Sequence, residues 1–164
     1  MTVHCRLALP QDFPAIRRML ELYQYELSDI WPQELDAQGE FGYNTAPHEQ
    51  ATHHFAHVLL VNEHYAGVAL VSPAKVTQRE GYWMEQFFVL KRYRRAGHGQ
   101  TLAEHVFRSH PGLWEVGQMP ANAAARDFWR AIITGVTRGE FVEVQLTQGW
   151  WQGTVQRFRV PPEL

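Results

Sequence analysis

The motif with the clearest chemical meaning is Arg94-x-x-Gly97-x-Gly99, which follows an apolar stretch and precedes residues with helical spacing. Glycines let the backbone turn sharply and let an anion approach main-chain N–H groups closely. A helix that starts directly after them adds unbonded N–H groups and the positive end of its dipole. The motif therefore predicts a pyrophosphate site over residues 94–100, with Arg94 and Arg95 adding positive charge. From the motif alone, a glycine-containing turn with a solvated basic face is the alternative.

Two other phosphate-binding motifs fit this stretch less well. A Walker loop ends in Gly-Lys-Ser or Gly-Lys-Thr, whereas Gly99 is followed by Gln100 and Thr101. A dinucleotide fingerprint needs a third small residue three positions after Gly99, and Leu102 stands there. We therefore interpret the loop as neither of these motifs.

Glu85 is the candidate for acid–base chemistry, because it lies among aromatic residues in an apolar stretch. Strand alternation places Glu85, Phe87 and Val89 on one face of the predicted strand and Gln86 on the other. A carboxylate that is partly removed from water becomes a better proton acceptor, which suits a general base at neutral pH. The alternative is that Glu85 faces solvent or forms an ion pair.

The other residues that could do chemistry give weaker signals. Cys5 is the only cysteine, which excludes an intrachain disulfide, and we expect it to be a buried structural thiol. His48 and His53 resemble a zinc-protease motif with one residue too many, so we expect no metal. The chain has 15 basic and 17 acidic residues and a formal charge of −2, which argues against a general nucleic-acid-binding protein. Because no stretch suits a membrane span or a signal peptide, we expect a cytoplasmic protein.

Strands and helices must position these residues, and the apolar periodicity predicts their order. Apolar positions from Ile16 to Leu27 recur with the spacing of an amphipathic helix. Residues 28–47, with two prolines and two glycines, predict a long irregular loop of the kind that is often functional. The strands are expected over residues 3–9, 57–62, 65–72, 81–90, 113–116, 140–147 and 150–160, with further helices around residues 48–56, 102–107 and 122–133. This pattern predicts a single α/β domain over residues 1–164.

Two motifs together resemble the GNAT superfamily of N-acetyltransferases. Residues 94–99, Arg-Arg-Ala-Gly-His-Gly, match that superfamily's Q/R-x-x-G-x-G/A pattern, and Asn122-x-x-Ala125-x-x-Phe128-Trp129 is similar to its N-x-x-A-x-x-F-Y helix. The order of predicted elements agrees over nearly the whole chain, and within the superfamily the sequence resembles a group of uncharacterised bacterial "predicted acetyltransferases". The resemblance implies an α/β fold whose central mixed sheet is mostly antiparallel, with helices on both faces and splayed fourth and fifth strands.

The resemblance also implies which residues bind acetyl-CoA. Main-chain groups of Phe88, Val89 and Leu90 would pair with the pantetheine arm. Asn122 would reach the pantetheine or the leaving side of the thioester. Main-chain N–H groups of Arg94, Arg95, Ala96, Gly97, His98, Gly99 and Gln100 would hold the pyrophosphate, and Ala125, Phe128 and Trp129 would line the cofactor wall.

Two positions depart from the family pattern. Family members that read Glu-Phe-Phe-Val place the acid at the position of Gln86, and not of Glu85. Trp129 stands where many members have a proton-donating Tyr. An indole N–H donates a hydrogen bond but is not an acid, so water or another Tyr would have to protonate the thiolate.

The expected activity is transfer of an acetyl group from acetyl-CoA to a primary amine of a small molecule or a protein, by direct attack on the thioester. The expected partners are acetyl-CoA and this amine, without a membrane and without a metal, and a homodimer is left open. One alternative is a domain that binds CoA or acyl-CoA without catalysis. A more distant alternative is a nucleic-acid-binding module that uses the basic cluster at residues 91–95.

Overall fold

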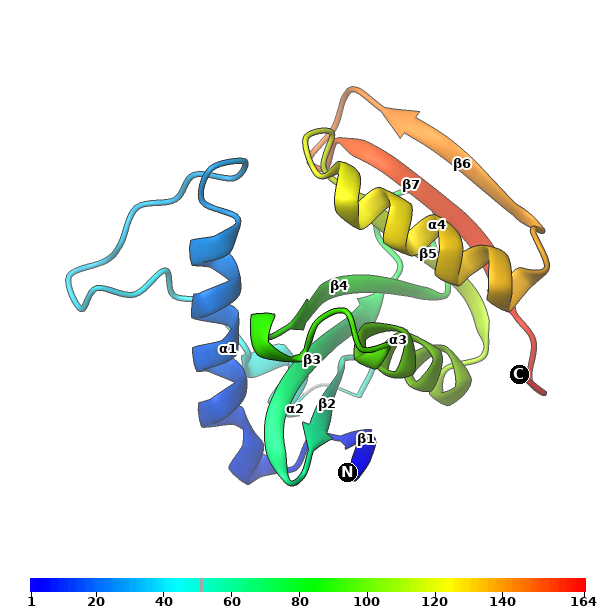
Figure 1. Ribbon diagram of the computed structural model, residues 1–164. Helices are drawn as coiled ribbons and strands as arrows, with labels where there is room; N and C mark the ends of the chain where they lie inside the picture. The colour runs from blue at the N-terminus through cyan, green and yellow to red at the C-terminus, as the bar shows by residue number, and fades with distance from the viewer. Residues whose placement is uncertain (51) are drawn as a thin grey trace. The chain divides into compact units, whose positions relative to one another are not determined.

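The structure is a computed structural model that describes residues 1–50 and 52–164, and Figure 1 shows its strands and helices. Their order along the chain confirms the predicted succession of strand, helix, loop, three strands, helix, strand, helix and two strands. Among the described residues, no helix is long and apolar enough to cross a membrane. The strands are β1 (Val3–Leu7), β2 (Phe55–Val61), β3 (His64–Pro73), β4 (Tyr82–Val89), β5 (Gly112–Gln118), β6 (Phe141–Leu146) and β7 (Gly153–Val160). The helices are α1 (Phe13–Glu26), α2 (Ala46–Gln50), α3 (His98–Ser109) and α4 (Ala123–Thr137), with short 3-10 turns η1 (Pro10–Asp12) and η2 (Lys91–Tyr93).

The strands form a sheet in the order β1-β2-β3-β4-β5-β7-β6. β1 pairs with β2, β5 with β7, and β6 with β7, all antiparallel. β4 and β5 are parallel, and their register joins Tyr82 to Trp114 and Trp83 to Glu115. This register covers the first two residues of the eight-residue β4. The prediction of a mixed, mostly antiparallel sheet is confirmed.

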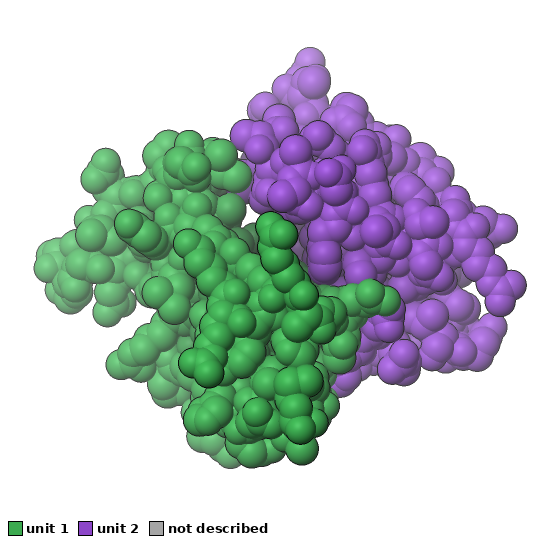
Figure 2. Space-filling model, viewed as in Figure 1, with its two compact units in different colours: residues 1–70, 86–102 green, residues 71–85, 103–164 purple. Residues whose placement is uncertain are grey.

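The contacts between residues divide the chain into two compact units, which are coloured separately in Figure 2. Unit 1 contains residues 1–70 and 86–102, and unit 2 contains residues 71–85 and 103–164. The chain passes between the units within β3, β4 and α3, so each of these elements contributes residues to both. A single domain over residues 1–164 stays a prediction.

The core of unit 1 lies between α1 and the first strands. Alternate residues of β2 and β3 point to one face of a strand, and here they pack against the apolar stripe of the helix. Burial of this stripe removes large apolar side chains from water and stabilises the packing. The buried core residues are Phe13, Ile16, Met19, Leu20, Ala56, Val58, Leu60, Val68, Leu70 and Phe88.

Aromatic rings form the core of unit 2. Phe107 of α3 lies edge-on against Trp114 of β5 and Phe158 of β7, with ring centres 4.9 and 5.4 Å apart. The Trp114 indole N–H donates to the main-chain oxygen of His110 at 2.8 Å, so the buried polar edge of this ring is satisfied. α4 contacts β5, β6 and β7 and covers the apolar side chains of this part of the sheet.

The turn between β2 and β3 and the start of α2 can be compared with the boundaries predicted from the sequence. Asn62 and Glu63 both have positive φ, at 49° and 65°, as a two-residue hairpin turn between β2 and β3 requires. The helix expected over residues 48–56 starts earlier, since α2 covers Ala46–Gln50. Pro47 is compatible with this early start because the first helical turn needs no proline N–H. The expected helix also included residue 51, which lies outside the described residues, and its last two residues belong to β2.

Candidate active site

The glycine loop connects the end of β4 to the start of α3. After η2, the backbone is extended at Arg94, whose φ and ψ are −80° and 161°. Arg95 and Gly97 then adopt positive φ, at 63° and 81°, and successive N–H groups in such a turn can form an anion-binding concavity. Thr101 donates its N–H to the main-chain oxygen of Gly97 at 3.0 Å, as an i to i−4 helical bond. The preceding N–H groups therefore occupy the first turn, where a helix offers them no acceptor of its own.

Gly97 is open on the side where a side chain would stand. A Cβ built there meets no described atom within 4 Å. Only the positive φ therefore favours glycine in the free protein, whereas the open space beside the main chain is available to an anion. His98, the next residue, is buried and lies edge-on to Tyr93, with ring centres 6.4 Å apart.

The side chain of Arg94 is turned toward α1. Its Nη1 and Nη2 atoms donate to the two carboxylate oxygens of Glu26, each at 2.8 Å, and its Nε donates to the main-chain oxygen of Val89 at 2.7 Å. The guanidinium is thus paired with Glu26, and its expected role at the pyrophosphate stays a prediction. The sequence offered no signal for this pairing, since Glu26 is 68 residues away.

At the end of β4, one edge of the main chain is hydrogen-bonded to β3. Leu90 donates its N–H to the main-chain oxygen of Ala66 at 2.8 Å. Because successive residues of a strand present their main-chain groups to opposite edges, the N–H of Val89 lies on the other edge from that of Leu90. Among Phe88, Val89 and Leu90, Val89 is thus the residue best suited to pair with an added pantetheine arm.

Glu85 forms an ion pair. The Nζ of Lys75 lies 3.1 Å from its Oε1, and 16% of the Glu85 side chain is exposed. The structure therefore bears out the ion-pair alternative for Glu85, while the carboxylate is also largely removed from water.

A buried carboxylate fixes the main chain that carries Lys75. Glu115 of β5 has no exposed surface. Its two carboxylate oxygens accept the N–H groups of Lys75, Val76 and Thr77 at 2.8, 2.7 and 2.7 Å, and the Thr77 hydroxyl at 2.8 Å. Four donors satisfy the buried charge. Trp150 adds a hydrogen bond from its indole N–H to the main-chain oxygen of Lys75 at 3.3 Å.

The second predicted motif begins α4. Asn122 is the N-cap, and its side-chain oxygen accepts the N–H of Ala125 at 3.2 Å. Trp129 is buried, 5.0 Å from Phe128 and 6.1 Å from Phe107 between ring centres. These contacts give Asn122 and Trp129 local structural roles, and their predicted contacts with acetyl-CoA stay predictions, as do those of Ala125 and Phe128.

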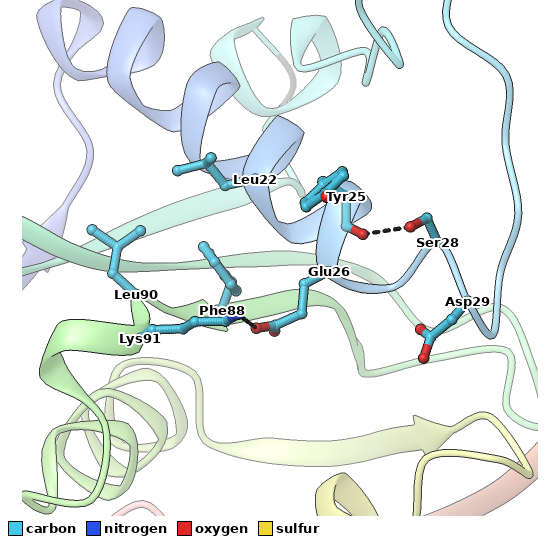
Figure 3. A pocket seen from close by; sticks show the side chains of 8 residues that line it. All are labelled: Leu22, Tyr25, Glu26, Ser28, Asp29, Phe88, Leu90 and Lys91. Carbon is cyan, nitrogen blue, oxygen red and sulfur yellow. Dashed lines mark hydrogen bonds and ion pairs between the residues drawn. The ribbon is translucent and has the colours of Figure 1, made fainter.

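A pocket of about 510 Å³ lies in unit 1 at the end of α1 (Figure 3). Apolar side chains and charged groups share its wall. Its wall combines the end of α1 with the end of β4, two segments that are distant in the chain. Its lining residues are Leu22, Tyr25, Glu26, Ser28, Asp29, Phe88, Leu90 and Lys91.

The irregular segment after α1 is held in place by carboxylates. Glu21 accepts the N–H groups of Phe41 and Gly42 at 2.7 and 2.9 Å, which returns the segment to the helix. Asp36 accepts the N–H groups of Gln38 and Glu40 within the segment. The long loop expected at residues 28–47 is therefore confirmed as irregular up to α2, and it is internally bonded.

A known protein family matches most of this chain. The model for the acetyltransferase (GNAT) family matches residues 16–132, which include most of α1, the glycine loop and most of α4. The chain belongs to the GNAT acetyltransferase family. Members of this family transfer an acyl group from acyl-CoA to an amine, and this confirms the family expected from the two motifs. No curated protein matches the sequence.

Solved structures share the GNAT fold at low sequence identity. An acetyltransferase from Thermus thermophilus has a TM-score of 0.70 and 15% identity, with 98% of each chain covered. The ribosomal-protein-S18-alanine N-acetyltransferase from Escherichia coli has a TM-score of 0.65 and 16% identity, covering 98% of this chain and 95% of its own. AAC(6')-Iy, solved with the bisubstrate analogue CoA-S-monomethyl-acetylneamine, has a TM-score of 0.65 and 17% identity, covering 93% and 99%. At these identities the likeness establishes the fold and not the acceptor.

Proposed function

We propose that this GNAT protein transfers an acetyl group from acetyl-CoA to a primary amine by direct attack on the thioester. The observation that carries the proposal is the loop before α3, where positive φ at Arg95 and Gly97 precedes the first turn of a 12-residue helix. Such a turn presents main-chain N–H groups and the positive end of the helix dipole to a pyrophosphate. The open space beside Gly97 fits an anion at this position.

The cofactor contacts proposed for this chain are mainly made by the main chain. N–H groups from Arg95 to Gln100 bind the pyrophosphate, because the Arg94 N–H already donates to the main-chain oxygen of Lys91 at 3.2 Å. Val89 pairs with the pantetheine arm. An N–H near Val89 also suits the oxyanion that develops on the thioester carbonyl. Asn122, Ala125, Phe128 and Trp129 contribute through the start of α4. The buried positions of His98 and Trp129 favour a role in shaping these contacts over direct bonding.

The reaction forms a bond between the amine nitrogen and the acetyl carbon and breaks the bond between that carbon and sulfur. The amine gives up a proton and the departing thiolate gains one, so the products are an acetylated amine and CoA. A primary ammonium has a pKa near ~10, so a base assists the reaction at neutral pH. Because Trp129 cannot act as an acid, we assign protonation of the thiolate to water.

We assign the base to Glu85, acting directly or through water. Lys75, at 3.1 Å from Glu85 Oε1, keeps the carboxylate in the charged form that can accept a proton but lowers its basicity, whereas the burial of Glu85 acts in the opposite direction. The buried Glu115 holds the main chain of Lys75, so we interpret Glu115 and Lys75 as positioning residues for Glu85.

Release of thiol from acetyl-CoA in the presence of amines tests the proposal. The panel contains a peptide with N-terminal alanine, an aminoglycoside and a linear polyamine, because fold relatives are described as an alanine N-acetyltransferase and as bound to an acetylneamine analogue. We expect thiol release to depend on at least one amine, and mass spectrometry to detect its acetylated form. Calorimetric binding of CoA without amine-dependent thiol release would instead favour a non-catalytic CoA-binding domain.

A further inference from the structure

Arg94 joins three elements of unit 1. Its guanidinium binds Glu26 at the end of α1 with two bonds of 2.8 Å, and its Nε binds the main-chain oxygen of Val89 in β4. The guanidinium also lies 5.4 Å from the centre of the Phe88 ring. Since Arg94 itself begins the glycine loop, one side chain connects the end of α1, the end of β4 and the loop.

Side chains that surround Arg94 also line the pocket. Phe88 stacks on Tyr23 of α1, with ring centres 5.0 Å apart. Lys91 places its Nζ 4.0 Å from Glu26 as a second cation. Glu26, Phe88 and Lys91 all line the pocket (Figure 3). The same group of side chains therefore forms a wall of the pocket and the start of the loop.

Arg94 could bind phosphate or position the loop, and its hydrogen bonds distinguish these two roles. A phosphate ligand needs guanidinium N–H groups that are available to the phosphate. Here three of the five guanidinium N–H groups already donate to Glu26 and Val89, in the forked arrangement that a lysine cannot reproduce. Turning the group toward a phosphate would break these three bonds. About a third of each side chain is exposed, 35% for Arg94 and 29% for Glu26, so the pair contributes more to geometry than to stability.

We propose that Arg94 is a positioning residue that couples the pocket at the end of α1 to the cofactor loop, and that it is not a phosphate ligand. The inference rests on the proposed function, because the loop is the proposed pyrophosphate site. Its consequence is that ligands of the pocket and of the loop influence each other through the Glu26–Arg94 pair.

The test compares Arg94→Lys, Glu26→Gln and the double variant by calorimetric titration with CoA. If Arg94 positions the loop through Glu26, each single variant weakens CoA binding by about fivefold, the scale of a partly exposed charged pair, and the double variant is no weaker than either. If Arg94 binds phosphate, Arg94→Lys retains most of the affinity, and Glu26→Gln binds CoA as tightly as the wild type or more tightly. That result would overturn the proposal.

Hydrogen exchange in the protein without CoA supplies a second measurement. Both single variants should speed exchange in residues 27–45 and 94–100, whereas loss of a phosphate ligand would leave exchange unchanged. Arg17→Gln is the matched control. Arg17 also lies on α1, and it forms a 3.4 Å ion pair with Glu49 of α2. It should change neither CoA affinity nor exchange at residues 94–100. A wild type that fails to bind CoA would overturn the proposed function, and unchanged exchange in both variants would overturn the coupling.

Discussion

The ammonium of Lys75, in the loop after β3, lies 3.1 Å from the carboxylate of Glu85, which stands within β4. The main chain of Lys75 is in turn held by a buried third residue, Glu115, which accepts its N–H at 2.8 Å. The proposed role of Glu85 as a base can be tested separately from the stability of this arrangement.

Replacing Glu85 with Gln should lower the turnover rate by about 10²-fold or more at neutral pH, because the amide keeps the shape but cannot accept a proton. Acetyl-CoA affinity should stay unchanged. The measurement is a pH–rate profile with whichever amine proves active, with the exposed Glu80→Gln as control. A profile that overlays the wild type at every pH would remove Glu85 from the mechanism, and substrate positioning would become the main source of catalysis.

Replacing Glu115 with Gln should lower the free energy of unfolding by about 2–3 kcal/mol, because an NH₂ group would then face main-chain N–H donors and leave them buried and unsatisfied. Urea unfolding measures this loss. Glu80→Gln again serves as control and should stay within about 0.5 kcal/mol of the wild type, as exposed substitutions usually do. Equal stability of the two variants would mean that the Glu115 bonds do not hold the Lys75 segment.

Replacing Gly117 with Ala should destabilise unit 2. A Cβ there would fall 2.6 Å from indole atoms of both Trp83 and Trp151, whose rings meet edge-on with centres 5.4 Å apart. We expect a loss of about 1–3 kcal/mol, the usual effect of overpacking, and a changed tryptophan fluorescence spectrum. Gly135→Ala is the control, because Gly135 lies in the exposed face of α4 with no described atom within 4 Å of its Cβ position. That variant should gain about 0.5–1 kcal/mol.

Acid should destabilise the protein in two successive, slightly overlapping pH windows. Burial lowers the pKa of His110 to about 4, from 6.5, and hydrogen bonds from Arg130 lower the pKa of Glu143 to about 2, from 4.5. At both positions the unfolded chain takes up its proton at a higher pH, so the free energy of unfolding falls as the pH is lowered. The loss through His110 spans pH 6.5 to about 4, and that through Glu143 spans pH 4.5 to about 2.

Urea unfolding across this pH range separates the two groups. His110→Gln should flatten the upper window, and the bond from Trp114 should survive because it is made to the main-chain oxygen of residue 110. Glu143→Gln should reduce the slope in the lower window only, and the remaining slope there belongs to Asp12, whose pKa the bond from Arg6 lowers from 3.8 to about 2. If the slope between pH 6.5 and 4.5 is the same in His110→Gln as in the wild type, burial of His110 does not control it.

Local patterns predicted most of the fold. The strand alternation and the helical stripes from Ile16 onward identified the order of elements, because these periods depend on neighbouring residues. The start of α2 differs from the prediction because Pro47 lies inside its first turn, where proline is tolerated. The glycine loop was also predictable, since the residues that form it are consecutive.

The partners of the candidate site residues were not predictable in the same way. Arg94 meets Glu26 and Glu85 meets Lys75 through tertiary packing, and an ion pair between distant positions leaves no periodic signal. Glu115 was missed for a related reason. A buried carboxylate is unfavourable unless several donors surround it, and those donors are main-chain N–H groups, which every sequence contains.

Calorimetric titration of CoA into the wild type, Gly97→Val and Gly139→Val tests the central claim most directly. Gly97 and Gly139 both have a φ of 81° and no described atom within 4 Å of the Cβ position, so the two substitutions impose a similar backbone strain. The account predicts that both variants lose similar stability but that only Gly97→Val loses CoA binding, because its side chain occupies the space proposed for the pyrophosphate. Unchanged CoA affinity in Gly97→Val, or an equal loss in Gly139→Val, would contradict a pyrophosphate site at this loop.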